Sequence, residues 1–233
     1  MNLYAGTSGY SYKEWKGSFY PEDLSAKDML SYYAGRLPAV EINNTFYRLP
    51  QRAMLENWHS QVPDEFRFSL KASQRITHFK RLNAVEEETK YFLETASVLG
   101  NGLGVVLFQL PPNMKKDVTR LRDFLQELPP QPRTAFEFRH ATWFDDEVLT
   151  ILRNHNRALC ISDTDDLPAT VIDATADWGY LRLRRVEYGE RDLAEWLKRI
   201  KGQSWKDTFV FFKHEDEGTG PKLAAQFLAL AKT

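Results

Sequence analysis

Eight short, β-rich apolar runs alternate with segments of helical period along the 233 residues, and this alternation predicts an α/β protein with parallel strands. Eight such units are the number that closes a single (β/α)8 TIM-like barrel. No linker, repeat or low-complexity tract divides the chain, so residues 1–233 are predicted to form one domain. A doubly wound open sheet is the alternative fold.

The predicted strands are short runs rich in β-branched and aromatic residues, and helices are predicted between them from apolar residues that share one helical face. The strands begin near Leu3, Ala39, Phe66, Leu103, Thr134, Ala158, Trp178 and Thr208. The clearest helical faces are Val85, Phe92, Leu93, Ala96 and Leu99; Leu121, Phe124, Leu125 and Leu128; Leu193, Trp196, Leu197 and Ile200; and Leu223, Ala224, Phe227, Leu228 and Ala231.

Two local features concern the first and the sixth unit. Ser25-Ala26-Lys27-Asp28 resembles a capping box and predicts the start of the first helix. The segment from Asp163 to Asp177 contains Pro168 and has little helical period, so a shortened sixth βα unit is predicted.

Composition and charge exclude several classes of protein. The net charge of −1 and the isoelectric point near 6.5 provide no general attraction to nucleic acid or anionic membranes. No signal peptide and no apolar stretch of membrane-spanning length is visible, so no membrane association and a cytoplasmic location are predicted. The single cysteine, Cys160, lies in an apolar run and is predicted to be a small buried hydrophobe.

The alternation of side chains along the strands directs polar groups toward the barrel axis. In the second strand Val40 and Ile42 suit the helix side, so Glu41 and Asn43 are predicted to point inward. The same alternation turns further polar side chains inward on later strands: Ser69 and Lys71, Glu137 and Arg139, and Tyr180, Arg182 and Arg184. The fourth strand ends in Gln109.

Ions at the axis of a barrel require an explanation, because burying an ion costs on the order of several kcal/mol unless it is paired. One explanation is a self-contained ion network that fills the barrel, in which Glu41 and Glu137 pair with Lys71, Arg139 or Arg182. The other is a ligand site at the C-terminal ends of the strands, where barrels carry their function. The site is favoured, with Glu137 in a wet mouth where its replacement by Gln costs little stability.

The predicted site residues follow from these positions. A carboxylate can act as a general acid or base when burial or a like charge moves its pKa toward neutrality, whereas neighbouring cations lower that pKa. Histidines that follow the third and fifth strands are suited to proton transfer. The predicted catalytic residues are Glu41, Glu137, His78 and His140. The predicted substrate-binding residues are Asn43, Tyr47, Arg48, Lys71, Gln109, Arg139 and Arg182.

No metal and no cofactor is predicted, because the five histidines match no recognised metal motif and the dinucleotide and Walker patterns are absent. A zinc site is the alternative. It would use His78, His140 and His214, which follow the third, fifth and eighth strands, together with Asp163.

An ordered set of motifs resembles one known family. The set is Gly6-Thr7-Ser8-Gly9-Tyr10, Trp15-Lys16-Gly17, Phe19-Tyr20-Pro21, Glu41-Ile42-Asn43-Asn44-Thr45-Phe46-Tyr47, Ile76-Thr77-His78, Phe108-Gln109-Leu110-Pro111-Pro112 and Glu137-Phe138-Arg139-His140. This order resembles the YecE-like family, the bacterial and archaeal domain of unknown function number seventy-two. The resemblance runs to about Trp143 and implies a TIM-like barrel, but no particular reaction.

Beyond Trp143 the chain departs from the pattern of that family. The family tends to end its seventh strand with Arg-x-His-Gly, where this chain has Arg182-Leu183-Arg184-Arg185. The eighth strand of the family tends to finish near Phe-Asn-Asn, where this chain has Phe212-Lys213-His214.

Three functions compete. The favoured one is a cofactor-independent barrel enzyme (a hydrolase, lyase or isomerase) that uses carboxylate acid–base chemistry on a small polar or anionic molecule. The second is a nucleic-acid-processing, endonuclease-like barrel, which the missing metal cluster and the balanced charge disfavour. The third is a non-catalytic binding protein. A metal assay, a salt-dependent nucleic-acid binding curve and a metabolite stabilisation screen distinguish the three.

Overall fold

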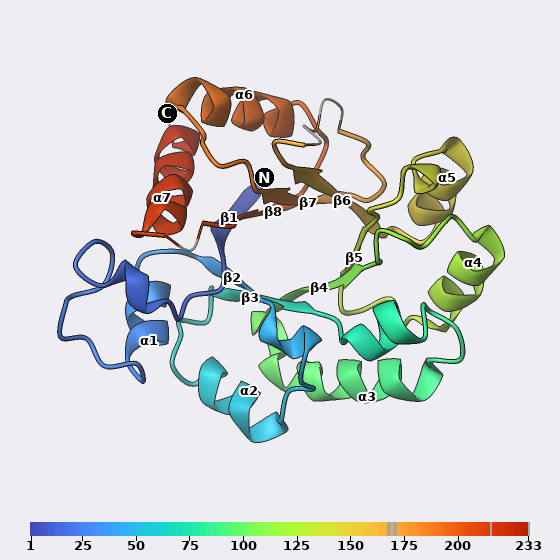
Figure 1. Cartoon of the computed structure of the whole chain (residues 1–233), viewed down its shortest axis with the longest axis horizontal. Helices are drawn as coiled ribbons and strands as arrows, with labels where there is room; N and C mark the ends of the chain where they lie inside the picture. The colour runs from blue at the N-terminus through green and yellow to red at the C-terminus, as the bar shows by residue number, and fades with distance from the viewer. Residues whose placement is uncertain (167–168, 170–171, 215, 233) are drawn as a thin grey trace.

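The structure, a computed structural model, describes residues 1–166, 169, 172–214 and 216–232. Its strands form a closed barrel in the order β1 to β8, with parallel pairing between neighbours (Figure 1). They are β1 (Asn2–Ser8), β2 (Ala39–Ile42), β3 (Arg67–Lys71), β4 (Leu103–Gln109), β5 (Thr134–Glu137), β6 (Ala158–Asp163), β7 (Trp178–Leu183) and β8 (Asp207–Phe212). Because β1 also pairs with β8, the predicted barrel is confirmed and the open sheet is excluded.

The α-helices surround the ring of strands (Figure 1). Among the described residues they are α1 (Met29–Ala34), α2 (Arg52–His59), α3 (Glu86–Ala96), α4 (Val118–Glu127), α5 (Asp146–Asn154), α6 (Glu190–Lys201) and α7 (Thr219–Ala231). Short helical turns are η1 (Lys13–Trp15), η2 (Asn44–Phe46), η3 (Arg75–Phe79), η4 (Ser97–Gly102) and η5 (Ala141–Trp143). Most residues of the four predicted apolar faces are buried against the barrel, which confirms the helical period as the signal for these helices.

The predicted start of the first helix is wrong. Helix α1 begins at Met29, and the Ser25 hydroxyl donates to the carboxylate of Asp28 over 2.6 Å instead of capping a helix. The polar side chains therefore stabilise a turn before the helix, a competing use of the same residue types.

The predicted shortening of the sixth βα unit concerns the connection from β6 to β7. Its described residues are not assigned to a helix, but residues 167, 168, 170 and 171, with the predicted breaker Pro168 among them, lie outside the described residues. The shortening therefore stays a prediction.

The inside of the barrel changes from apolar to charged along its axis. The apolar part is a cluster of buried inward-facing side chains: Ala39, Val105, Leu107, Ala135, Ala158, Cys160, Trp178, Tyr180, Phe209 and Phe211. Cys160 is 4% exposed, which confirms its predicted role as a buried hydrophobe. Since Glu41 and Arg182 lie two residues further along their strands than Ala39 and Tyr180, the charged side chains stack on this apolar layer toward the C-terminal ends.

No helix among the described residues is long and apolar enough to cross a membrane.

Candidate active site

Glu41 is completely buried and hydrogen-bonded on both carboxylate oxygens. Its Oε1 accepts from Ser8 Oγ and from Arg182 Nη2, each over 2.7 Å, and its Oε2 accepts from the Tyr180 hydroxyl over 2.7 Å. Asn43 adds an amide donor 3.2 Å from Oε1. Strand register explains the contact with Ser8, because Ser8 of β1 pairs directly with Glu41 of β2.

Glu137 binds the other terminal nitrogen of the Arg182 guanidinium. Arg182 Nη1 donates to Glu137 Oε2 over 2.6 Å, and Arg184 Nη1 lies 3.7 Å from Oε1. Gln109 is the register partner of Glu137 and its side chain also hydrogen-bonds to the carboxylate. The structure therefore brings Glu41 and Glu137 into one network, with Arg182 between them.

The predicted wet location of Glu137 is wrong. The residue is only 2% exposed, and its partner charges are Arg182 and Arg184 rather than Lys71 or Arg139. A buried ion network, the alternative explanation of the inward charges, is thus present below the mouth. It consists of Glu41, Glu137 and Arg182. It does not extend to every predicted site residue, because a second group of cations lies above it.

The electrostatics of the network keep both carboxylates ionised. Burial raises the pKa of Glu41, but Arg182, Arg184 and the hydrogen bonds from Tyr180 and Ser8 outweigh it and lower the pKa to about 2. The pKa of Glu137 is also lowered, because the same two guanidinium groups outweigh burial there. At neutral pH these groups can therefore accept a proton but have none to donate.

Lys71 and His78 lie above the network and share one aromatic neighbour. Lys71 Nζ is 3.9 Å from the centroid of the Phe46 ring, and the His78 ring meets the same ring edge to face at 4.8 Å. Burial is the largest cause, and the charge of Arg182 the second, of a lowered pKa of Lys71, which is about 8. Burial and the charges of Lys71 and Arg139 lower the pKa of His78 to about 4, so its imidazole is neutral at pH 7.

The remaining predicted residues lie further out. Tyr47 is 74% exposed, and Arg48 and Arg139 are also exposed. His140 uses Nδ1 to accept from the backbone N–H of Thr142 over 3.2 Å, which makes it the cap of η5. These side chains belong to the rim of the mouth. Arg139 acts on the inner residues through its charge near His78, and the Tyr47 ring packs edge to face on Phe46 at 4.9 Å.

The residues of the zinc alternative are engaged separately. His214 Nε2 lies 2.7 Å from the Arg185 carbonyl oxygen, while the buried carboxylate of Asp163 accepts from Arg185 Nε and from the Tyr188 hydroxyl. Within the described ranges no group of three or more His, Cys, Asp or Glu side chains is arranged to hold a metal ion. The absence of a bound metal or cofactor stays a prediction.

Four residues of the mouth were not among the predicted site residues. Tyr180 and Arg184 have the inward position that strand alternation predicts, so alternation alone was enough to include them among the candidate site residues. Ser8 is the last residue of β1, and only the strand register places it against Glu41. The ring of Phe46, which touches both Lys71 and His78, comes from η2 and has no period that could reveal it.

His78 is expected to make folding stability depend on pH in acid. Its pKa of about 4 in the folded protein lies below the ordinary value near 6.5, so the unfolded chain binds the proton first and stability is lost as the pH falls between these values. We expect His78→Gln to reduce the difference in unfolding free energy between about pH 7 and pH 4.5. Urea denaturation at both pH values measures it, and an unchanged difference would contradict the assignment.

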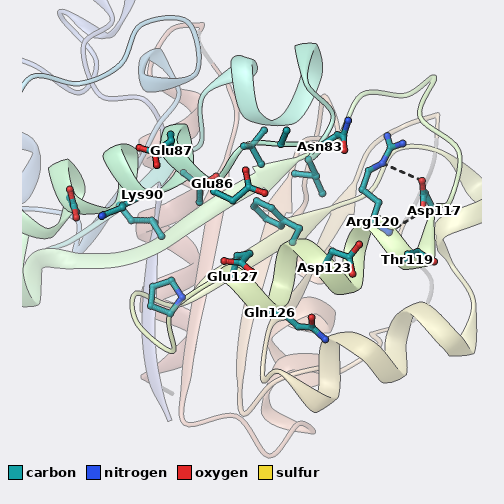
Figure 2. A pocket seen from close by; sticks show the side chains of 18 residues that line it. Asn83, Glu86, Glu87, Lys90, Asp117, Thr119, Arg120, Asp123, Gln126 and Glu127 are labelled. Atoms are coloured by element: carbon teal, nitrogen blue, oxygen red, sulfur yellow. Dashed lines mark hydrogen bonds and ion pairs between the residues drawn. The ribbon is translucent and has the colours of Figure 1, made fainter.

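A separate hollow lies outside the barrel, between α3 and α4 (Figure 2). Its volume is about 810 Å³, and its lining includes carboxylates labelled in Figure 2: Glu86, Glu87, Asp117, Asp123 and Glu127. None of the predicted site residues lines it. Among the described residues that line it, Lys90 and Arg120 are the only cations, so this hollow repels anions and is distinct from the mouth.

The closed barrel and the charged cluster at its C-terminal end define a (β/α)8 barrel protein with a candidate active site in the position usual for that fold. More specifically, the chain belongs to the family described as "Protein of unknown function DUF72", whose model matches residues 4–233. The match continues well past Trp143, so the family extends over the two strands whose ends depart from its usual pattern.

Relatives from three bacteria agree with this assignment. The UPF0759 protein YunF of Bacillus subtilis is 25% identical over 232 residues, which cover 92% of this chain and 79% of YunF. The UPF0759 protein YecE of Escherichia coli is 32% identical over 134 residues, covering 56% of this chain and 49% of YecE. The crystal structure of a DUF72 family protein from Thermotoga maritima is 26% identical and superposes with a TM-score of 0.80 over the whole of both chains.

Proposed function

We propose that the protein is a cofactor-independent enzyme that binds a small anionic substrate at the C-terminal mouth of the barrel and transfers protons there. Arg184, Lys71 and Arg139 hold the anion. His78 and the ionised Glu137 are the proton acceptors. The reactions compatible with this chemistry are those of a hydrolase, a lyase or an isomerase.

The observation that carries the proposal is the incomplete pairing of Arg184. Its side chain is 20% exposed, its nearest carboxylate is 3.7 Å away, and its buried Nε has no hydrogen-bond partner among the described residues. A buried donor without a partner costs about 1–3 kcal/mol, whereas an anion can engage a guanidinium with two parallel hydrogen bonds. Arg184 is therefore suited to an anionic ligand group.

The charge balance of the mouth supports the same ligand class. The carboxylates of Glu41 and Glu137 face the guanidinium groups of Arg182 and Arg184, and the Lys71 amine and the Arg139 guanidinium are additional. In the described part of the chain neither Lys71 nor Arg139 forms an ion pair with a carboxylate. A surplus of positive charge in a partly desolvated mouth attracts small anions.

The test is the binding of inorganic phosphate, measured by isothermal titration calorimetry at low ionic strength. We expect the wild type to bind phosphate with one site and Arg184→Met to bind it roughly tenfold more weakly or worse, since charge-assisted hydrogen bonds are lost. The matched control is Arg122→Met, which removes an exposed guanidinium from α4 and should leave binding unchanged. Equal affinities for all three proteins would contradict the proposal.

The natural ligand can then be sought with a metabolite stabilisation screen, because a ligand raises the melting temperature by mass action. Nucleic acid stays the disfavoured partner, since the net charge is −1. The cytoplasm is the proposed location.

A further inference from the structure

Lys71 has a fixed and reachable position in the mouth. It is the last residue of β3 and lies on the inward face with Ser69, whose hydroxyl is 2.8 Å from that of Tyr180. The Thr45 hydroxyl donates to the Lys71 carbonyl oxygen over 2.7 Å and so fixes the backbone at this point. The side chain is partly exposed, so a ligand can reach its amine.

The groups that face Lys71 favour the neutral amine over a permanent charge. They come from several elements: Arg182 and Arg184 of β7, Glu137 of β5, Glu41 of β2, and the Phe46 ring of η2. The two carboxylates raise the pKa of Lys71, but the Arg182 guanidinium that lies between them opposes their attraction. Burial and the neighbouring guanidinium groups therefore prevail and lower the pKa of Lys71 to about 8.

A lysine in these surroundings is poorly suited to act only as an anion clamp. Arg184 and Arg139 already provide permanent positive charge at the mouth. Desolvation next to other cations is instead the arrangement that activates a lysine amine as a nucleophile. With a pKa of about 8, Lys71 contains roughly 200-fold more neutral amine near pH 7 than an unperturbed lysine does.

We infer that the Lys71 amine is a nucleophile for a carbonyl carbon, and that the substrate is a small anionic aldehyde or ketone that forms an imine with it. The inference rests on the proposed function, because Arg184 holds the anionic group of that substrate. It adds a covalent role for Lys71 and names the substrate class.

The imine forms without any oxidant or reductant. The neutral amine of Lys71 attacks the carbonyl carbon, a nitrogen–carbon bond forms, and the carbonyl oxygen takes a proton. The nitrogen then releases a proton, the new hydroxyl takes a second proton, the carbon–oxygen bond breaks, and one water molecule leaves. Release of the remaining nitrogen proton gives the imine, so the two protons gained by oxygen equal the two lost by nitrogen. His78, whose neutral ring packs on the same Phe46 ring as Lys71, is the group placed to pass these protons.

The test traps the imine in the wild-type protein. We incubate the protein with glyoxylate, an anionic aldehyde, and sodium cyanoborohydride, and measure the carboxymethyl adduct at each lysine by peptide mass spectrometry. At about pH 7.5 we expect Lys71 to be modified at least about tenfold faster than the exposed Lys201 of α6, which lies away from the acidic hollow, because burial and neighbouring cations leave more of the Lys71 amine neutral. The rate at Lys71 should rise with pH and level off above about pH 8.

Two comparisons separate the nucleophile from the anion site. Acetaldehyde carries no charge, so Arg184→Met should slow the modification of Lys71 by glyoxylate more than by acetaldehyde, for which only the smaller effect of Arg184 on the pKa of Lys71 is lost. Modification spread evenly over the lysines, or a rate at Lys71 that still rises steeply above about pH 10 as an unperturbed lysine requires, would overturn the inference. Should phosphate bind as proposed while Lys71 shows no preference, the inference fails and the anion site stands. A preference for Lys71 with acetaldehyde alone overturns the anionic substrate class.

Discussion

Arg182→Met is expected to lower the free energy of unfolding by roughly 3–5 kcal/mol, the largest loss among the changes considered. Arg182 is 1% exposed, and its two terminal nitrogens bind Glu41 and Glu137 at 2.7 and 2.6 Å. Methionine replaces only the apolar stem of the arginine and has no charge, so it leaves two buried carboxylates without their main partner. Urea denaturation at pH 7 measures the loss as a change in midpoint.

The stability lost in Arg182→Met should become smaller as the pH falls, an effect that lost packing alone does not produce. Without Arg182, burial raises the pKa of each carboxylate, and a raised pKa adds stability at low pH that is lost as the pH rises. The deficit of Arg182→Met relative to the wild type should therefore shrink between about pH 7 and pH 5. Arg139→Met, which removes an exposed guanidinium that pairs with none of the described carboxylates, is the control and should change stability by about 0.5 kcal/mol or less. A deficit of Arg182→Met below about 1 kcal/mol at pH 7 would contradict the network.

Within the strands themselves, alternation predicted which side chains enter the barrel. Val40 and Ile42 belong to the core outside the strands, while Glu41 lies inside, as the period of two requires. The signal is strong because each strand must bury one face against the helices. The same reasoning predicted the barrel from the number of alternating units.

Alternation could not predict which inward cation meets which carboxylate. That depends on the depth of each residue along the axis, which is set by register and by the point where a strand ends. Arg139 lies two residues beyond Glu137, after β5 has ended, and is therefore exposed at the rim. Arg182 lies one residue before the end of β7, deep enough for its long side chain to reach both carboxylates.

The same limit explains why Glu137 was wrongly predicted to be open to solvent. Strand alternation places Lys71 and Glu137 on the inward face of the barrel. It does not show which of these side chains is buried and which is open to solvent. In the structure the network of Glu41, Glu137 and Arg182 forms the lower layer, and Lys71 and Arg184 form the more accessible upper layer. Both explanations of the inward charges thus describe part of the barrel, at different depths.

Glu137→Gln is expected to change stability and anion binding in opposite directions. The carboxylate is 2% exposed and accepts from Arg182 over 2.6 Å, so its loss leaves one buried guanidinium with a single carboxylate partner. Arg184 loses its only carboxylate partner within the described residues. We expect the free energy of unfolding at pH 7 to fall by about 3 kcal/mol, measured by urea denaturation with an unchanged m-value.

Removing the same negative charge should strengthen the binding of inorganic phosphate severalfold, because Arg184 no longer shares its charge with a carboxylate. Calorimetric titration of the folded variant measures this gain, and Glu127→Gln, an exposed carboxylate of α4, is the control that should alter neither property. A variant that is as stable as the wild type would show that Glu137 is solvated, as the predicted wet mouth requires. A variant that loses stability and also binds phosphate more weakly would show that Glu137 holds Arg184 in its binding position, so that the carboxylate supports the anion site instead of opposing it.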